Sequence, residues 1–184
     1  PLINERVSTL GFTNEGGVGG KIRFLKKIAG LWLVQECGRD WSHAGREYSY
    51  AELTQLASES KGFGAIIEPD NAAFAAPASM TQAIEKYCAQ SGQRAPEDAG
   101  AFVRCCLESL ALKYRWTMEK LEELRGAKIE VLHIVGGGTQ NKLLSQLTAD
   151  ALARPVIAGP VEATATGNIL TQAMVCGALK NAAE

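Results

Sequence analysis

Three consecutive glycines, Gly136, Gly137 and Gly138, directly follow a short apolar run in this chain of 184 residues. The run, residues 130–135, is predicted to be a buried strand, because short apolar runs that end in glycine are typical of strands inside a sheet. Beyond the glycines the apolar residues recur at helical spacing, so a helix is predicted over residues 140–152. The strand, the glycine turn and the helix follow one another without a linker, which favours an α/β fold.

The glycine turn also has the properties of a ligand site. Because glycine carries no Cβ, a flat ligand can lie directly against the backbone of the turn. The start of the following helix adds unpaired N–H groups and the positive end of a helix dipole, which suits a nucleotide. Gln140 and Asn141 lie at that start and would add neutral amides. Two interpretations stay open, a nucleotide site or a plain strand-to-helix turn, and Asn141 could also cap the helix.

The composition limits the class of protein. With 46% hydrophobic and 21% charged residues, the chain has the balance of a globular protein with one full core or two small lobes. A net charge of −1 argues against nucleic acid or an anionic membrane as the partner. No apolar stretch is long enough for a bilayer span, and no signal peptide is visible. We therefore expect a soluble, cytoplasmic protein, and the start at Pro1 suggests a piece of a longer one.

Five cysteines and two histidines show no metal-ligand spacing. An odd number of cysteines without a secretory signal indicates reduced thiols. Cys88 and Cys105 lie at the facing ends of two predicted helices joined by a turn, so their sulfurs could meet. The simpler interpretation, two buried apolar thiols, is preferred.

Hydrophobic spacing and turn residues predict the elements of the whole chain. Strands are expected over residues 5–13, 20–25, 65–67 (or an extended piece), 130–135 and 155–158, and helices over 27–40, 50–59, 79–90 (capped by Ser79 or Thr81), 96–125, 140–152 and 164–182. The last strand–helix–strand–helix series predicts parallel strands with a right-handed crossover. No linker marks a boundary, so one undivided domain over residues 1–184 is expected.

Three residues near the C-terminal elements have simple structural interpretations. His133 lies within the strand predicted over residues 130–135 and is expected to be a hydrogen-bonded core histidine. Glu162 precedes the last helix and is expected to stabilise the positive end of its dipole. Gly167 is expected to let that helix pack closely on the sheet. No acidic cluster offers a magnesium site, and no aspartate stands out as a catalytic base.

Three segments of the chain carry a family resemblance. They are NEGGVGGKIRFLKKIAGLWLVQ (residues 14–35), HIVGGGTQN (133–141) and RPVIAGPVEAT (154–164), the last followed by Gly167 and Asn168. In this order they resemble the C-terminal domain of the FGGY family of carbohydrate kinases. The first and third segments resemble the rhamnulokinase group of that family in particular, and the resemblance covers nearly the whole chain.

The resemblance implies a ribonuclease H-like, actin-type ATPase fold, with a mixed sheet flanked by helices. Two such domains form these kinases, so residues 1–184 would be the C-terminal, nucleotide-side domain, and its partner would be its own N-terminal domain. ATP with Mg²⁺ would bind in the cleft between the domains and would phosphorylate the 1-hydroxyl of L-rhamnulose. The resemblance also implies that the catalytic aspartate belongs to the N-terminal domain. The present chain alone is therefore expected to bind nucleotide weakly and to catalyse nothing.

The resemblance further assigns individual residues. It implies nucleotide contacts for Gly136, Gly137, Gly138 and Gln35, with Gln140 and Asn141 as neighbours of the adenine or the ribose. Without the resemblance, Gln35 is typical of a partly exposed helix residue. Lys27 departs from the family, which has an asparagine that would reach the sugar. As the candidate substrate contact, Lys27 could donate to a sugar hydroxyl or pair with phosphate, or it could turn to solvent.

Two alternatives to an L-rhamnulose kinase remain. The sugar could be another ketose, such as xylulose or fuculose. A non-catalytic regulatory or assembly module of the same fold would leave the glycine turn without a ligand. Lys27 and the absence of the catalytic half favour the module, whereas the glycine triplet with Gln140 and Asn141 favours the kinase.

Overall fold

The computed structural model describes residues 1–181 and divides the chain into two compact units. The sheet unit comprises residues 1–27, 128–140 and 155 onward, and the helical unit comprises residues 28–127 and 141–154. The chain therefore passes between the units at four points. Each unit is assembled from segments that lie far apart in the sequence.

The sheet unit contains two separate pairs of strands. β1 (Phe12–Gly16) and β2 (Ile22–Lys26) form an antiparallel hairpin, with Phe12 opposite Lys26. β3 (Leu132–Ile134) and β4 (Val156–Ala158) are parallel, with Leu132 opposite Val156. The predicted parallel pairing of the last two strands is confirmed. In the described residues, however, the two pairs form two sheets rather than one mixed sheet.

Two helices complete the sheet unit. α1 (Glu5–Thr9) lies where a strand over residues 5–13 is predicted, and that prediction is wrong in its first half. The reason is a local cap, because the Oδ1 of Asn4 accepts a hydrogen bond from the N–H of Val7 at 2.9 Å. α7 (Ala163–Val175) follows β4 and has no buried residue. It ends before the predicted residue 182, which itself lies outside the described residues. A Cβ at Gly167 would meet nothing within 4 Å, so the predicted close packing of this helix is wrong for the described chain.

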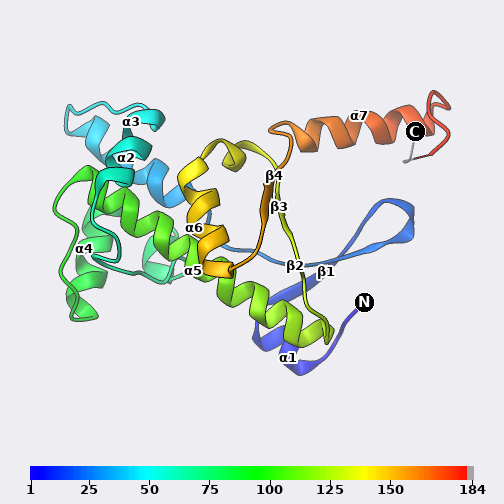
Figure 1. Cartoon of the computed structure of the whole chain (residues 1–184), viewed down its shortest axis with the longest axis horizontal. Helices are drawn as coiled ribbons and strands as arrows, with labels where there is room; N and C mark the ends of the chain where they lie inside the picture. Colours follow the sequence, from blue (N-terminus) through cyan, green and yellow to red (C-terminus); the bar gives the residue numbers. More distant parts are fainter. Residues whose placement is uncertain (182–184) are drawn as a thin grey trace. The chain divides into compact units, whose positions relative to one another are not determined.

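The helical unit is arranged around its longest helix. Its helices are α2 (Trp32–His43), α3 (Tyr50–Glu59), α4 (Met80–Gln90), α5 (Ala99–Arg125) and α6 (Lys142–Leu152), with a short 3₁₀ helix (Ala72–Phe74) before α4. α5, green in Figure 1, contacts α2, α3 and α6 and so forms the centre of the unit. In the part of the chain that the structure describes, no helix combines the length and apolar character needed to cross a membrane.

Capping residues explain where most of these helices begin. The Ser49 hydroxyl caps α3 and the Glu52 side chain closes the capping box, so the helix predicted over residues 50–59 is confirmed. Ser79 caps α4, which confirms one of the two predicted caps. Asp98 caps α5, so this helix begins later than residue 96.

Two segments of the helical unit differ from prediction because side chains bind their backbone. α2 begins at Trp32 rather than at residue 27, and the N–H of Ala29 donates to the Oδ1 of Asp70 at 2.7 Å. Residues 65–67 form no strand, since the N–H of Ile67 donates to the Oγ of Ser109 at 2.9 Å. A side chain of α5 thus takes the place of a partner strand.

The core of the helical unit is made by apolar side chains of all five helices from α2 to α6. It includes Leu33, Val34, Cys37, Ile84, Cys88, Val103, Cys105, Cys106, Leu107 and Leu110. Cys88 and Cys105 are both free thiols. Burial, with a smaller contribution from the Cys88 thiol, raises the pKa of Cys105 to about 12. The interpretation of Cys88 and Cys105 as buried apolar thiols is confirmed.

Candidate functional site

The predicted glycine turn follows β3 in the sheet unit and includes a short 3₁₀ helix (Gly137–Gln140). Gly136 has a φ of +88°, a left-handed conformation that L side chains rarely adopt. Its N–H donates to the carbonyl of Pro160 at 2.9 Å, which ties the turn to the chain after β4. The N–H and the hydroxyl of Thr139 donate to the carbonyl of Gly136 at 3.1 and 2.8 Å. Hydrogen bonds therefore hold the turn at both of its ends.

The next two glycines leave space beside the backbone. A Cβ built at Gly137 or at Gly138 would meet no atom within 4 Å, and Gly137 is exposed. A ligand can therefore approach the main chain here without displacing a described side chain. This is the property that the sequence predicts for a site that takes a flat ligand.

The helix that follows the turn begins at Asn141, which is almost fully buried. Its Oδ1 accepts a hydrogen bond from the N–H of Leu144 at 2.8 Å, so the predicted helix cap is confirmed. Its Nδ2 donates to the hydroxyl of Tyr50 on α3 at 2.9 Å. Both polar groups of Asn141 are therefore used inside the helical unit, while the neighbouring Gln140 is exposed.

Tyr50 is a partner of Asn141 that the sequence does not reveal. It lies 91 positions before Asn141, and in the sequence it is only one member of the apolar spacing of α3. Burial raises the pKa of Tyr50, and the hydrogen bond with Asn141 offsets this only in part. The hydroxyl therefore stays neutral at physiological pH. No pattern in a single sequence could have paired these two residues.

The other predicted contacts come from different elements. Gln35 is exposed on α2 of the helical unit, and Lys27 is exposed directly after β2 in the sheet unit. Within the described chain, neither side chain makes a hydrogen bond or an ion pair. The three glycines and Gln140 therefore lie in one turn, and Asn141 caps the helix that follows it. Gln35 lies on α2, and Lys27 lies directly after β2.

His133 and Glu162 follow the sequence expectations to different degrees. His133 is exposed on β3, so the predicted core role is wrong, because in the described chain this strand pairs only with β4. Glu162 directly precedes α7, the position from which its carboxylate is expected to stabilise the helix dipole, and its side chain accepts no capping hydrogen bond. Among the described residues, no group of three His, Cys, Asp or Glu side chains could hold a metal ion.

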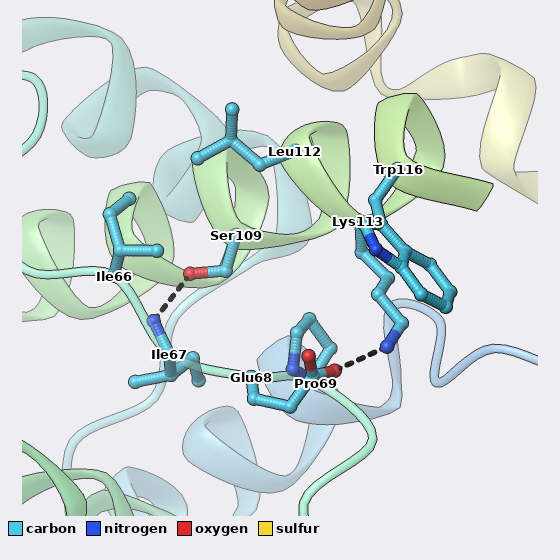
Figure 2. Close-up of a pocket in the computed structure, with 8 residues that line it drawn as sticks. All are labelled: Ile66, Ile67, Glu68, Pro69, Ser109, Leu112, Lys113 and Trp116. Atoms are coloured by element: carbon cyan, nitrogen blue, oxygen red, sulfur yellow. Dashed lines mark hydrogen bonds and ion pairs between the residues drawn. The ribbon is translucent and has the colours of Figure 1, made fainter. Parts of the chain in front are cut away.

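The helical unit also has a surface pocket of about 360 Å³ (Figure 2). It is lined by Ile66, Ile67, Glu68, Pro69, Ser109, Leu112, Lys113 and Trp116. The Nζ of Lys113 lies 2.6 Å from Glu68, 3.1 Å from Asp70 and 4.9 Å from the centroid of the Trp116 ring. Burial lowers the pKa of Lys113, but the two carboxylates outweigh it and raise the pKa overall. The two carboxylates also balance the positive charge of Lys113. None of the predicted site residues lines this pocket.

Similarity to known proteins shows the family of the chain. The family model that describes the C-terminal domain of the FGGY family of carbohydrate kinases matches residues 1–176. The chain therefore belongs to this family, and the predicted resemblance is confirmed.

Several relatives are rhamnulokinases of bacteria. The chain is 49% identical over 177 residues to the rhamnulokinase of Bacteroides thetaiotaomicron. The matched stretch covers 96% of this chain and 36% of the relative. It is 45% identical over 172 residues to that of Enterococcus faecalis, covering 92% of this chain and 34% of the relative. It is 44% identical over 185 residues to that of Pectobacterium carotovorum, covering 100% of this chain and 36% of the relative. The chain thus spans about a third of the length of these curated relatives.

Proposed function

We propose that this chain is the C-terminal, nucleotide-binding domain of an ATP-dependent sugar kinase. The whole protein would transfer the γ-phosphate of ATP to the 1-hydroxyl of L-rhamnulose. The observation that carries this proposal is the open backbone at Gly137 and Gly138 in the turn after β3, in a chain of the FGGY family. Similarity to rhamnulokinases supports the choice of sugar.

The predicted residues have chemistry that suits a nucleotide. Gly136 sets the turn, and Gly137 and Gly138 offer space and backbone N–H groups. The first turn of α6 adds the positive end of a helix dipole, which favours the negative charge of a phosphate. The exposed amides of Gln35 and Gln140 would bind the base or the ribose without adding charge. Asn141 belongs to the site through the helix start that it caps.

The remaining parts of the reaction would come from the rest of the protein. Phosphoryl transfer needs positioning of the phosphates, a metal ion that bridges them, and a base for the hydroxyl proton. The proposed kinase is cytoplasmic and has two domains of ribonuclease H-like fold. Its N-terminal domain would supply the base, and Mg²⁺ would be held mainly by that domain and by the nucleotide. Lys27, exposed after β2, would donate to a sugar hydroxyl or pair with a phosphate oxygen.

The substitution Gly137→Asp tests the proposed site. Because a Cβ at Gly137 meets nothing within 4 Å, the variant should fold like the wild type. Its carboxylate would occupy the space beside the backbone and repel a phosphate. In the full-length protein we expect ADP to bind about 10- to 100-fold more weakly, measured by isothermal titration calorimetry.

Gly16→Asp is the matched control, because it makes the same change of charge at another open glycine of the sheet unit. It should bind ADP like the wild type. If a folded Gly137→Asp protein bound ADP with wild-type affinity, the turn would not be the nucleotide site.

An assay of the full-length protein with L-rhamnulose, xylulose and fuculose then identifies the sugar, with L-rhamnulose expected to give the highest kcat/KM. If ADP does not stabilise even the wild type, the chain is the non-catalytic module instead.

A further inference from the structure

A second segment of the sheet unit, residues 159–162 between β4 and α7, lies against the glycine turn. The N–H of Gly136 donates to the carbonyl of Pro160 at 2.9 Å. A Cβ at Gly136 would lie 4.0 Å from the carbonyl oxygen of Val161. Glu162 is the next residue, and consecutive Cα atoms are only about 3.8 Å apart. The side chain of Glu162 therefore begins close to the turn.

The carboxylate of Glu162 is available to a ligand. The residue is exposed, and its side chain accepts no capping hydrogen bond from α7. Within the described chain it makes no other hydrogen bond and no ion pair. A glutamate side chain is long and flexible, so the carboxylate can turn toward the space that Gly137 and Gly138 leave open. It breaks no polar contact of the described chain when it does so.

We propose that Glu162 binds the ribose of the nucleotide through the hydroxyl groups of the sugar. This inference rests on the proposed function of the glycine turn. An ionised carboxylate only accepts hydrogen bonds, and the 2′- and 3′-hydroxyls of a ribose can donate them. In dinucleotide-binding folds an acidic residue holds a ribose hydroxyl in the same way, together with a glycine-rich turn. Glu162 thus selects nucleotides that carry these hydroxyls.

The same carboxylate decides which part of the nucleotide lies beside it. Its negative charge repels phosphate oxygens, so the phosphates extend away from Glu162. Val161, the residue before it, is 38% exposed and adds an apolar surface that suits the ring of a base or a ribose rather than a phosphate. The ribose therefore lies at the Val161 and Glu162 side of the turn. A carboxylate placed at Gly137 acts differently, because it would fill the space of the ligand itself.

A purely structural role for Glu162 is the alternative. As the residue before α7, it also lies where a negative charge stabilises the helix dipole. Such a role affects the stability of α7 and treats all nucleotides alike. Binding of the ribose affects only ligands that carry the hydroxyl groups. The ratio of the affinities for ADP and for 2′,3′-dideoxy-ADP therefore separates the two roles.

Isothermal titration calorimetry of the full-length protein with ADP and 2′,3′-dideoxy-ADP tests the inference. The wild type should bind ADP about 10- to 100-fold more tightly than the dideoxy nucleotide, which is the effect of hydrogen bonds to a charged group. Glu162→Ala should weaken the binding of ADP by a similar factor and leave the dideoxy nucleotide unchanged, so that the ratio falls to about one. Glu162→Gln keeps an acceptor without the charge, and it should keep a preference of about 3- to 10-fold.

Glu130→Ala is the matched control, because it removes an exposed carboxylate of the same unit that lies before β3, at the end of the strand opposite the turn. It should leave the affinities for both nucleotides unchanged. A wild-type protein that binds both nucleotides equally would overturn the ribose role. A Glu162→Ala protein that keeps the wild-type ratio would overturn it as well.

Gly137→Asp distinguishes failure of this inference from failure of the proposed function. If Gly137→Asp loses ADP while Glu162→Ala binds both nucleotides like the wild type, only the role of Glu162 is overturned. If neither variant changes the affinity for ADP, the nucleotide site lies elsewhere and both proposals fail. An equal loss of both nucleotides in Glu162→Ala would indicate the structural role at α7 and would also overturn the ribose contact.

Discussion

Glycine has three different roles in this chain, and only the environment of each residue separates them. At Gly136 the backbone conformation itself requires glycine, since φ is +88°. At Gly137 the missing side chain leaves open space beside the main chain. At Gly100, near the start of α5, the missing side chain lets α3 approach, because a Cβ there would lie 2.5 Å from the Oγ of Ser60 and 2.7 Å from the carbonyl oxygen of Leu56.

Gly100→Ala should therefore destabilise the helical unit. The clash with the backbone of Leu56 cannot be relieved by rotating a side chain, so α3 and α5 must move apart. We expect a loss of about 1–3 kcal/mol in the free energy of unfolding, measured by urea denaturation. Gly167→Ala in α7 is the control, because it adds the same methyl group where no atom lies within 4 Å. It should stabilise by up to about 1 kcal/mol through helix propensity, and equal losses in both variants would contradict this account.

At the scale of elements, polar side chains decide how the helices begin and how they are joined. Ser49, Ser79 and Asn141 cap α3, α4 and α6, and these starts could be predicted because capping residues are local signals. The connection between α2 and α4 is not local. The Oδ2 of Asp40 accepts from the hydroxyl of Ser79 at 2.8 Å, and from the N–H and the hydroxyl of Thr81 at 2.8 and 2.9 Å. One carboxylate on α2 thus binds the first turn of α4.

Asp40→Asn should weaken this connection in a pH-dependent way. Burial alone would raise the pKa of Asp40, but the hydrogen bonds from Thr81 and Ser79 outweigh it and lower the pKa below 3.8. A carboxylate with a lowered folded-state pKa contributes stability above its unfolded pKa and loses it as the pH falls through the folded pKa. At pH 7 the variant should be about 1 kcal/mol less stable, and urea denaturation should show this difference shrinking below about pH 4.

A difference that stayed constant down to pH 2 would show that charge has no part in this connection. Asp150→Asn is a suitable control, since this exposed carboxylate on α6 accepts a hydrogen bond from the neighbouring side chain of Gln146, at 2.8 Å. It should change stability by less than about 0.5 kcal/mol at every pH.

At the scale of the whole molecule, the two units are built differently. The helical unit surrounds α5, which has eleven buried residues, and the described part of the sheet unit has no comparable centre. In α7 no residue is buried, and its large apolar side chains Ile169 and Val175 are 66% and 84% exposed. A helix without buried side chains has little tertiary packing to stabilise it, because isolated helices of this length are marginal in water.

Native-state hydrogen exchange should reflect this contrast in the isolated chain. Amides of α5 over residues 102–111 should exchange most slowly, and those of α7 should exchange fastest among the helices that the structure describes. If the remainder of the proposed kinase covers the apolar side chains of α7, the same amides should become protected in the full-length protein. Slow exchange of α7 in the isolated chain would show that this helix is stable without such a cover.

The sequence by itself determined what depends on neighbouring residues. Periodicity predicted most of the helices and the parallel β3–β4 pair, and the glycine triplet indicated an open turn, because spacing, caps and missing side chains act over a few positions. It missed α1 and the exposure of His133. Only the tertiary structure decided that Tyr50 meets Asn141 and that Gly100 lies against Leu56. Such contacts join residues that are distant along the chain, and they depend on how helices pack, which no local pattern encodes.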